Sequence, residues 1–394
     1  MTDRLYPAEF VFPGHPDKLS DAIADAIVSA AAARETRALV GVEVAVHRRR
    51  VLVTGRVACE GADAIDIPNI VREVYRSAGY GGAWDPLPEQ LRIDTDLCLG
   101  PLADGEAEFR ELSDDQAICV GYAVDSPATQ YLPIEQFLAY RLARRLHALR
   151  LQYPALQLGP DGKVIVAVSV DNGIAQLREF SASLQQKQIA DEIALHRAVR
   201  VALTEELQQL AATVKGLLTA LPEQLTVNGA GAFEVGGPEG DNGLSGKKLV
   251  MDAYGPRVPI GGGAWSGKDF FKADRAGGLH ARRIAKLLVM TGLAKEATVT
   301  LGWRPGDTTP QIFSCEGASL EAARRCAALL NFTLAFSGEH WGRTAALQEL
   351  ARWGHYTDAR HWWERMGLSA DQSAYIASGQ QQQMGQADCT KNSA

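Results

Sequence analysis

The sequence predicts a protein of mixed α and β structure that divides into two or three domains. Its 394 residues, 46% of them hydrophobic and 22% charged, are enough for a large apolar core and for more than one domain. Leu19, Ile23 and Ile27 recur at a spacing of four, which is typical of a helix with one apolar face. Residues 40–46 and 50–57 are rich in valine, which favours two neighbouring β-strands.

The first predicted helix begins at Pro16, because proline is favoured in the first turn of a helix. Asp17 and Asp21 lie near this end, where the helix dipole stabilises negative charge. The two predicted strands follow, with basic residues 47–50 at their turn, and a second helix is expected over 68–78. Residues 79–115 are rich in Gly, Pro and Asp, so we expect a long mobile or active-site loop and a domain boundary there.

The rest of the chain continues the alternation of helices and strands. We expect a helix over 133–150 and a hairpin of 155–158 with 164–170 about residues 159–162. Residues 227–278 are dense in glycine, which brings the backbone close to a ligand. A helix over 274–293, a strand over 297–301 and a helix over 319–332 complete a third block. The glutamine-rich end is predicted to be a disordered tail.

Composition excludes several classes of function. The chain has 40 basic and 47 acidic residues, and its formal net charge of −7 opposes binding to nucleic acid. The N-terminus lacks a charged leader followed by an apolar stretch, and no run of about 18 apolar residues occurs. We therefore expect a cytoplasmic protein without a membrane partner. Six scattered cysteines without a C-x-x-C pair suggest neither a zinc site nor a disulfide framework.

The first of three chemical motifs is the segment 14–18, Gly-His-Pro-Asp-Lys. It places an imidazole, a carboxylate and an ammonium group at the start of a helix. Backbone N–H groups there attract anions, and a carboxylate can hold Mg²⁺. A helix start that is merely well capped is the alternative interpretation.

The other two motifs are glycine-rich and carry lysines. In residues 236–248 the glycines allow close approach to a nucleotide, and Lys247 and Lys248 can neutralise phosphate. Residues 262–268 fit the spacing of a P-loop, but Asp269 stands where that motif needs Ser or Thr, so an ordinary P-loop is excluded. A glycine-rich surface turn and a flexible linker remain the respective alternatives.

Together the three motifs, in this order and separation, resemble the methionine adenosyltransferase (S-adenosylmethionine synthetase) family from about residue 10 to 367. The resemblance implies an α+β fold of three similar sheet-plus-helix domains at 1–101, 113–228 and 229–367, followed by the tail at 368–394. It implies synthesis of S-adenosylmethionine from ATP and L-methionine, with triphosphate displaced from C5′ and then cleaved to pyrophosphate and phosphate. The implied cofactors are Mg²⁺ and K⁺, and the implied assembly is a homodimer or a dimer of dimers with active sites at the subunit interface.

The resemblance also assigns residues. Catalytic roles are implied for His15, Lys163, Lys268 and Lys272. The implied ATP site contains Asp115, Asp161, Phe233, Asp241, Lys247 and Lys248. The implied substrate pocket is bordered by Asp115, Asp241 and Lys272. Asp17 and Asp274 would hold Mg²⁺, and Glu43 is the potassium-associated glutamate. Without the family context, Asp161 and Lys163 also fit an ordinary hairpin turn. Glu43 also fits a solvated position on a strand, and Phe233 fits a position in the core.

The departures from the family lie at the methionine side. Arg56 falls where the family has a glutamate that holds the methionine amino group, and Leu99 replaces a glutamine that contacts methionine. A guanidinium would repel an ammonium group. The nucleophile is therefore L-methionine or a related small molecule, and a catalytically silent nucleotide-binding paralogue is the third hypothesis.

Overall fold

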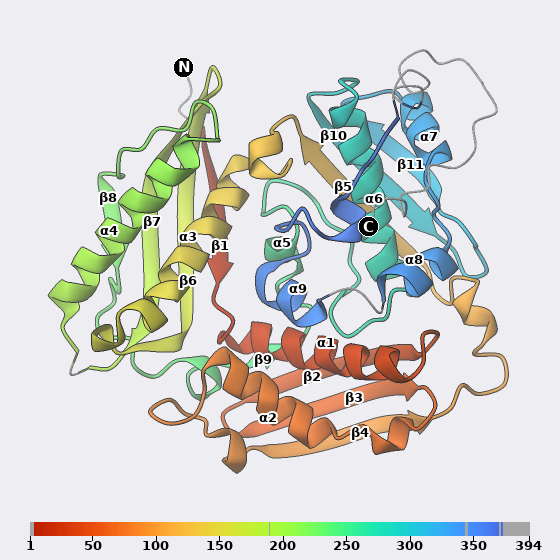
Figure 1. Ribbon diagram of the computed structural model, residues 1–394, viewed down its shortest axis with the longest axis horizontal. Coiled ribbons are helices and arrows are strands. Elements are labelled where there is room, and N and C mark those ends of the chain that lie inside the picture. The colour runs from red at the N-terminus through yellow and green to blue at the C-terminus, as the bar shows by residue number, and fades with distance from the viewer. Residues whose placement is uncertain (1–3, 189, 343–345, 370–371, 373–394) are drawn as a thin grey trace.

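The computed structural model describes residues 4–188, 190–342, 346–369 and 372. In these ranges three β-sheets, each covered on one face by helices, surround a centre that holds α5 (Leu249–Asp252) and α9 (Leu347–Trp353) (Figure 1). The predicted α+β fold with three sheet-plus-helix domains is confirmed. The predicted tail at 368–394 lies almost entirely outside the described residues.

The first sheet has the strand order β4-β3-β2-β9. Its strands are β2 (Leu39–His47), β3 (Arg50–Ala58), β4 (Arg92–Gly100) and β9 (Gly243–Leu244). The β3–β4 pair is parallel and the other pairs are antiparallel. Helix α1 (Pro16–Arg34) packs on β2, and α2 (Ile67–Ala78) packs beside α1.

The second sheet has the order β1-β6-β7-β8. Its strands are β1 (Leu5–Val11), β6 (Leu158–Asp171), β7 (Ile174–Gln186) and β8 (Gln224–Val227), and its helices are α3 (Ile134–Gln152) and α4 (Glu192–Ala211). The third sheet has the order β11-β10-β5. It consists of β5 (Ala117–Val124), β10 (Glu296–Trp303) and β11 (Gln311–Glu316), covered by α6 (Ala273–Met290) and α7 (Leu320–Ala328), with α8 (Leu334–Trp341) beside α6.

Helix α1 lies between the first sheet and the centre of the molecule. It begins at Pro16 as predicted, with His15 as its N-cap residue. Leu19, Ile23 and Ile27 are fully buried, and the helix packs on β2 on one side and on α9 on the other. Burial of each such side chain stabilises the fold by about 1.5–3 kcal/mol. Helix α1 is thus a rigid central element, and its first turn carries the Gly-His-Pro-Asp-Lys motif.

Each sheet takes one strand from a distant part of the chain. β1 joins β6, although three strands of the first sheet and β5 of the third sheet lie between them in the sequence. β9 joins β2, and β5 joins β10. The three stretches 1–101, 113–228 and 229–367 are therefore interlocked through strand exchange, and the domain boundaries themselves stay a prediction.

Two local predictions are wrong. Residues 159–162 do not form a turn, because β6 runs through them with an irregular register between Leu158 and Gly162. The hairpin turn lies at Asn172 and Gly173, whose φ angles of 49° and 79° suit a tight β-turn. The long loop expected over 79–115 contains β4, whose pairing with β3 is hidden in the sequence because most of its side chains are exposed or only half-buried.

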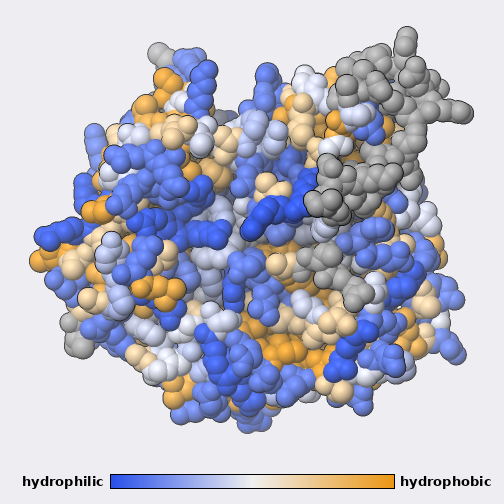
Figure 2. Space-filling view, in the orientation of Figure 1, coloured by the Kyte–Doolittle hydropathy of each residue, from blue (hydrophilic) through white to orange (hydrophobic). Residues whose placement is uncertain are grey.

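The face of the molecule seen in Figure 2 is mainly hydrophilic, with its largest apolar area low in the middle, where α1 and the first sheet lie in Figure 1. None of the described helices is both long and apolar enough to cross a membrane.

Candidate active site

The start of α1 holds the first group of predicted residues. His15 accepts a hydrogen bond at Nδ1 from the backbone N–H of Asp17, at 3.2 Å. Nε2 therefore carries the ring proton. Burial and, next, the charge of Lys248 lower the pKa of His15 to about 4. The imidazole is neutral at pH 7, and its Nδ1, 3.8 Å from an Asp17 oxygen, makes no ion pair.

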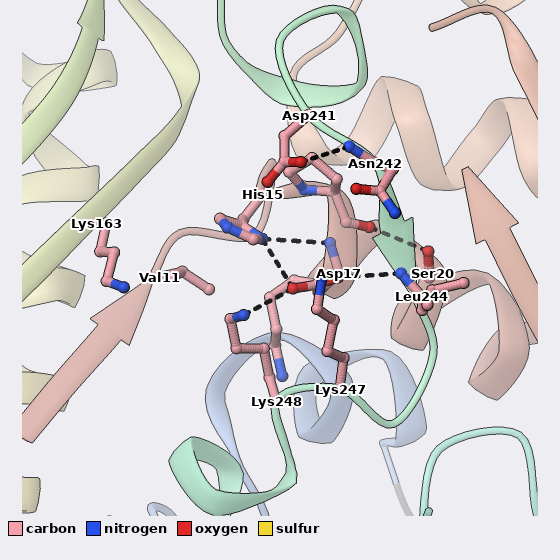
Figure 3. A network of polar contacts seen from close by, with 12 residues as sticks. Val11, His15, Asp17, Ser20, Lys163, Asp241, Asn242, Leu244, Lys247 and Lys248 are labelled. Atoms are coloured by element: carbon pink, nitrogen blue, oxygen red, sulfur yellow. Dashed lines mark hydrogen bonds and ion pairs between the residues drawn. The ribbon is translucent and has the colours of Figure 1, made fainter. Parts of the chain in front are cut away.

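Asp17 joins this helix start to the lysines of the second motif (Figure 3). Its Oδ1 accepts the backbone N–H of Leu244 at 3.0 Å, and its Oδ2 accepts Nζ of Lys248 at 2.7 Å. Nζ of Lys247 lies 3.8 Å from Oδ1. Burial alone would raise the pKa of Asp17, but the hydrogen bonds from Lys248 and Leu244 outweigh it, and the pKa lies below its usual value. Asp17 is an ionised carboxylate between two ammonium groups.

A cavity of about 400 Å³ opens beside this helix start. The predicted residues that line it are His15, Asp161, Lys163, Phe233 and Asp241. Its size is typical of small-molecule sites. The ring of Phe233 lies so close to Gly236 that a Cβ atom there would come within 2.8 Å of it. The cavity thus has an aromatic face that suits a flat ligand, and its charged lining residues are Asp161, Asp241 and Lys163.

Asp161 and Lys163 reach this cavity from β6. Asp161 is buried and its Oδ2 accepts the backbone N–H of Gly237 at 2.7 Å. Burial raises the pKa of Asp161 to about 6 in spite of that hydrogen bond. Lys163 forms an ion pair with Glu9 of β1. Both residues therefore belong to the sheet, not to a hairpin turn.

A second group of predicted residues lies at the start of α6. Lys268 pairs with Asp274, and Lys272 pairs with Asp114. The predicted Asp115 is exposed instead, and its Oδ1 accepts the backbone N–H of Gln116 at 2.7 Å. Asp114 is therefore the partner of Lys272 in this chain, and the role of Asp115 in the ATP site and the substrate pocket stays a prediction.

Asp269 explains why the third motif is not a P-loop. Its buried carboxylate accepts the backbone N–H groups of Val40 at 2.7 Å and Phe271 at 2.8 Å, and pairs with Arg110 at 3.1 Å. Asp269 therefore anchors the backbone of the motif and of β2, a role different from that of the Ser or Thr of a P-loop. Lys268 also precedes the helix by several residues, because Lys272 is the N-cap residue of α6.

Glu43 and Leu99 lie exposed on the first sheet. Arg56, paired with Gly41 across the β2–β3 ladder, donates to Glu106 from Nε at 3.1 Å and from Nη2 at 2.9 Å. Nη2 also donates to the carbonyl of Pro101 at 2.8 Å. Hydrogen bonding by Arg56 lowers the pKa of Glu106, so the pair is ionised at neutral pH. The positive charge expected at position 56 is therefore neutralised by a partner within the chain.

These residues form two groups within one chain. We call His15, Asp17, Asp161, Lys163, Phe233, Asp241, Lys247 and Lys248 the first cluster, and Asp114, Lys268, Lys272 and Asp274 the second cluster. Five residues of the first cluster line the cavity, and Asp17, Lys247 and Lys248 join them through the contacts of Asp17 with His15 and with both lysines. The ion pairs of the second cluster lie within that cluster, and none of its residues lines the cavity. Neither Arg56 nor Leu99 lines it. A single chain therefore does not bring all the predicted residues into one cavity.

Sequence reasoning missed several residues that hold these clusters. Asp21 and Asp25 follow Asp17 at helical spacing. From the sequence, Asp21 is explained only by the helix dipole, and no role is assigned to Asp25. Lys18 pairs in the interior with Asp252 and Asp21. Asp114 and Glu106 lie in the segment that was expected to be a loop. The four-residue spacing of Asp17, Asp21 and Asp25 could have indicated a row of aspartates on one helix face. No sequence pattern indicates that Asp114 pairs with Lys272 or that Glu106 pairs with Arg56.

The described residues contain no group of three or more His, Cys, Asp or Glu side chains that could hold a metal ion by themselves. Mg²⁺ commonly takes one or two carboxylates and completes its shell with phosphate oxygens and water. Asp17 and Asp274 each stand beside lysines, which fits a magnesium ion that arrives with a polyphosphate. Fold and clusters together define a three-domain α+β protein whose lysines suit a polyanionic ligand.

Comparison with known proteins identifies the family. Residues 3–91, 110–233 and 235–365 match the N-terminal, central and C-terminal domains of S-adenosylmethionine synthetase. The chain is 37% identical to the S-adenosylmethionine synthase of Desulforudis audaxviator (strain MP104C) over 327 residues, 79% of this chain and 80% of the relative. It is 33% identical to that of Corynebacterium kroppenstedtii in an alignment 413 positions long, which covers 96% of this chain and 100% of the relative. The chain therefore belongs to the S-adenosylmethionine synthetase family.

Proposed function

We propose that the protein is a methionine adenosyltransferase, which forms S-adenosylmethionine from ATP and L-methionine. Family membership supports this activity. In the structure, the observation that carries the proposal is the first cluster, in which a neutral His15 and two lysines lie around Asp17 beside one cavity.

The reaction is a displacement at C5′ of ATP. A lone pair of the methionine sulfur forms the S–C5′ bond while the C5′–O5′ bond breaks, and the electron pair of the broken bond leaves with the triphosphate. Water then hydrolyses the triphosphate to pyrophosphate and phosphate. Negative charge grows on the leaving oxygen, and the sulfur becomes a sulfonium. Donors that are already in place for this charge lower the barrier, and loss of one commonly costs about 3 kcal/mol.

The first cluster supplies such donors. His15, neutral and protonated on Nε2, would donate a hydrogen bond to the leaving oxygen. Lys247 and Lys248 would neutralise the phosphate chain, and Phe233 would pack on the adenine ring. Asp161 and Asp241 border the same cavity and would contact the nucleoside. Lys163 would move from Glu9 towards the phosphates.

Metal ions complete the proposal. Asp17 and Asp274 would hold Mg²⁺, which supplies further positive charge to the triphosphate when bound. Glu43, exposed on β2, would accompany K⁺. The requirement for K⁺ and the cytoplasmic location stay predictions.

We also propose a homodimer, in which the second cluster of one copy completes the first cluster of its partner. This arrangement is supported by the observation that no residue of the second cluster lines the cavity beside the first cluster of the same chain. Leu52, Ile118 and Ile165 supply apolar surface on β3, β5 and β6, with exposed fractions of 45%, 60% and 45%. They alternate with buried neighbours that point towards the covering helices, so all three lie on the opposite sheet faces. Exposed apolar faces of this kind mark association surfaces. A dimer of dimers stays a prediction.

L-methionine is the proposed nucleophile because Arg56 does not present an unopposed charge. Its guanidinium is engaged by Glu106 and two backbone carbonyls. The argument for a different nucleophile rested on that charge and on the replacement of a glutamine by Leu99, and Glu106 removes the first of these two grounds. The argument for a silent paralogue is opposed by the intact His15, Asp17 and Lys268.

The test is product analysis by mass spectrometry after incubation of the purified protein with ATP, Mg²⁺ and L-methionine. We expect S-adenosylmethionine with one pyrophosphate and one phosphate for each product. A panel of other amino acids and thioethers runs in parallel. Adenosylation of another member of the panel, without methionine turnover, would replace this proposal, and no turnover with any of them would favour the silent paralogue.

A further inference from the structure

Three aspartates on one face of α1 reach from the helix to the backbone of the glycine-rich motifs. Asp17, Asp21 and Asp25 are spaced by four residues and are almost completely buried, with exposed fractions of 1%, 1% and 0%. Each accepts one backbone N–H from a glycine-rich segment: Leu244 at 3.0 Å, Gly246 at 2.7 Å and Gly267 at 2.9 Å, respectively. A four-residue spacing places side chains in one row along a helix.

The two glycines in this row directly precede the lysines of the two clusters. Gly246 precedes Lys247 and Lys248, and Gly267 precedes Lys268. Both glycines have left-handed backbone conformations, with φ of +78° and +86°. Asp21 and Asp25 therefore hold the backbone one residue before Lys247 and Lys268, respectively.

Asp25 holds its glycine together with an arginine. Arg275 donates to both carboxylate oxygens of Asp25, at 2.7 and 2.8 Å, and also to the backbone carbonyl of Lys268 at 2.9 Å. Gly267 N–H and Lys268 C=O are thus both tied to the same buried ion pair. Lys268 has its backbone anchored on two sides while its ammonium group pairs with Asp274.

The other side of both glycine segments pairs with the edge of β2. Gly243 and Leu244 pair with Val46 and Ala45, and Lys268 forms a bridge with Gly41. The carbonyl of Gly267 also accepts the N–H of Val42 at 3.0 Å. The two segments lie one after the other along one strand edge, each held between that edge and an aspartate of α1.

We propose that Asp21 and Asp25 are positioning residues for two different active sites of the homodimer. Asp21 places Lys247 and Lys248 in the first cluster, and Asp25 places Lys268 in the second cluster. This inference rests on the proposed function and on its shared active sites. One helix then fixes the cations of both sites to which its chain contributes. Asp17 and Asp25 are eight residues apart, or about 12 Å along the helix.

Single substitutions give the first readout. We expect Asp21→Ala to lower kcat at least tenfold and to weaken binding of inorganic triphosphate, measured by calorimetry. Asp21→Asn keeps an acceptor oxygen for Gly246 and should remain within about threefold of wild type, since Lys18 still pairs with Asp252. The matched control is Asp191→Ala, which removes an aspartate that accepts a backbone N–H at the start of α4, at 2.9 Å, far from any cluster lysine in the sequence. It should leave kcat unchanged.

Heterodimers with two affinity tags give the decisive test. In the trans heterodimer one copy carries Asp21→Ala and the other Asp25→Ala. Both substitutions then fall in one active site, and about half of the wild-type activity should remain. In the cis heterodimer both substitutions lie in one copy beside a wild-type partner, each site is damaged, and little activity should remain.

Other outcomes decide against the inference. Equal activity of the two heterodimers would reduce the aspartates to a general structural role, and more activity in the cis form would place both clusters in one site of a single chain. If Asp25→Ala does not fold, Lys268→Ala marks the second cluster in the same design. The wild-type dimer keeps the two questions apart, because a wild type that forms no S-adenosylmethionine overturns the proposed function, whereas an active wild type with indistinguishable heterodimers overturns this inference.

Discussion

Arg56 shows how a single contact changes the meaning of a residue. From the sequence alone its charge opposes the binding of methionine. In the structure the carboxylate of Glu106 accepts hydrogen bonds from two N–H groups of Arg56. The same carboxylate also accepts the backbone N–H of Ala103 at 2.7 Å. Arg56 and Glu106 are 50 residues apart in the sequence, and no local pattern connects them.

We expect Glu106→Gln to raise the KM for methionine several-fold with little change in kcat. The substitution leaves the guanidinium of Arg56 without its counter-charge at the position where the resemblance places the substrate ammonium. The double variant Arg56→Gln, Glu106→Gln removes both charges and should recover most of the affinity. Steady-state kinetics with methionine varied at saturating ATP measures both. An unchanged KM in Glu106→Gln would remove Arg56 from the methionine pocket.

His147 on α3 gives the fold a dependence on pH. Its ring lies edge-on to Phe12 and Trp353, with centroids 5.3 and 5.5 Å away, and Nε2 has no hydrogen-bond partner among the described residues. Burial and then the charges of Arg150, Arg352 and Arg144 lower the pKa of His147 from 6.5 to about 4. The folded state therefore binds fewer protons than the unfolded state between these values, and its stability falls as the pH drops through this window.

We expect His147→Phe to be less sensitive to acid than wild type. A pKa difference from 6.5 to about 4 corresponds to roughly 3 kcal/mol of unfolding free energy. Urea unfolding at pH 7 and pH 4 measures the loss in each protein, and the loss should be smaller in the variant by up to that amount. The same loss in both proteins would show that His147 does not titrate in this range. Other buried histidines act in the same direction, which is why the difference between the two proteins is the quantity to compare.

At the scale of elements, the regular helices and strands were predictable and their exceptions were not. The first predicted helix begins at Pro16 as α1 does, and the strands at 40–46 and 50–57 correspond to β2 and β3. β4 was not predicted because none of its nine residues is buried, so its sequence carries no clear alternation of apolar and polar residues. The glycine segments were recognised as ligand loops, but their support by α1 requires contacts between residues as far apart as 242 positions.

A substitution at Gly267 tests how the third motif is anchored to its neighbouring elements. A Cβ atom there would lie 2.2 Å from the carbonyl oxygen of Val42, and the φ of +86° disfavours any other residue. We expect Gly267→Ala to cost about 2 kcal/mol or more of unfolding free energy and to lower kcat at least tenfold, because Lys268 must shift.

The matched control is Gly262→Ala in the same motif. No atom lies within 4 Å of the corresponding Cβ position, and no left-handed φ is required there. Its stability and kcat should stay close to those of wild type, measured by urea unfolding and by product formation. Similar behaviour of the two variants would contradict the anchoring of Gly267 between β2 and Asp25.

At the scale of the whole molecule, the family resemblance predicted what periodicity could not. Alternation of helices and strands supports mixed α and β structure, whereas three sheets that exchange strands follow from long-range pairings such as β1 with β6. His15, Asp17, Asp241, Lys247 and Lys248 of the first cluster lie in contiguous motifs, whereas Asp161, Lys163 and Phe233 could be selected only through the family resemblance. Their division from the second cluster was visible only in space.

We expect Leu52→Asp to weaken the homodimer and to lower activity in parallel. Leu52 is 45% exposed on β3, and a charge on an apolar face opposes its burial against a partner. Leu151→Asp is the control, since Leu151 is 77% exposed near the end of α3 and should tolerate a charge. Light scattering and activity over a range of protein concentrations measure both effects. A monomer with full activity would remove the shared active site.

The exchange of strands between sheets also bears on how the chain is made. Leu244 is synthesised 227 residues after its partner Asp17, a delay of roughly 10–45 s at the usual pace of the ribosome. During that time the edge of β2 that pairs with β9 has no strand beside it. For the first part of it β1 also lacks its partner strand β6. Unpaired strand edges attract other chains, and pairings over such distances form slowly. The nascent chain should therefore depend on chaperones until the C-terminal third has emerged, and its yield should fall when synthesis outpaces them.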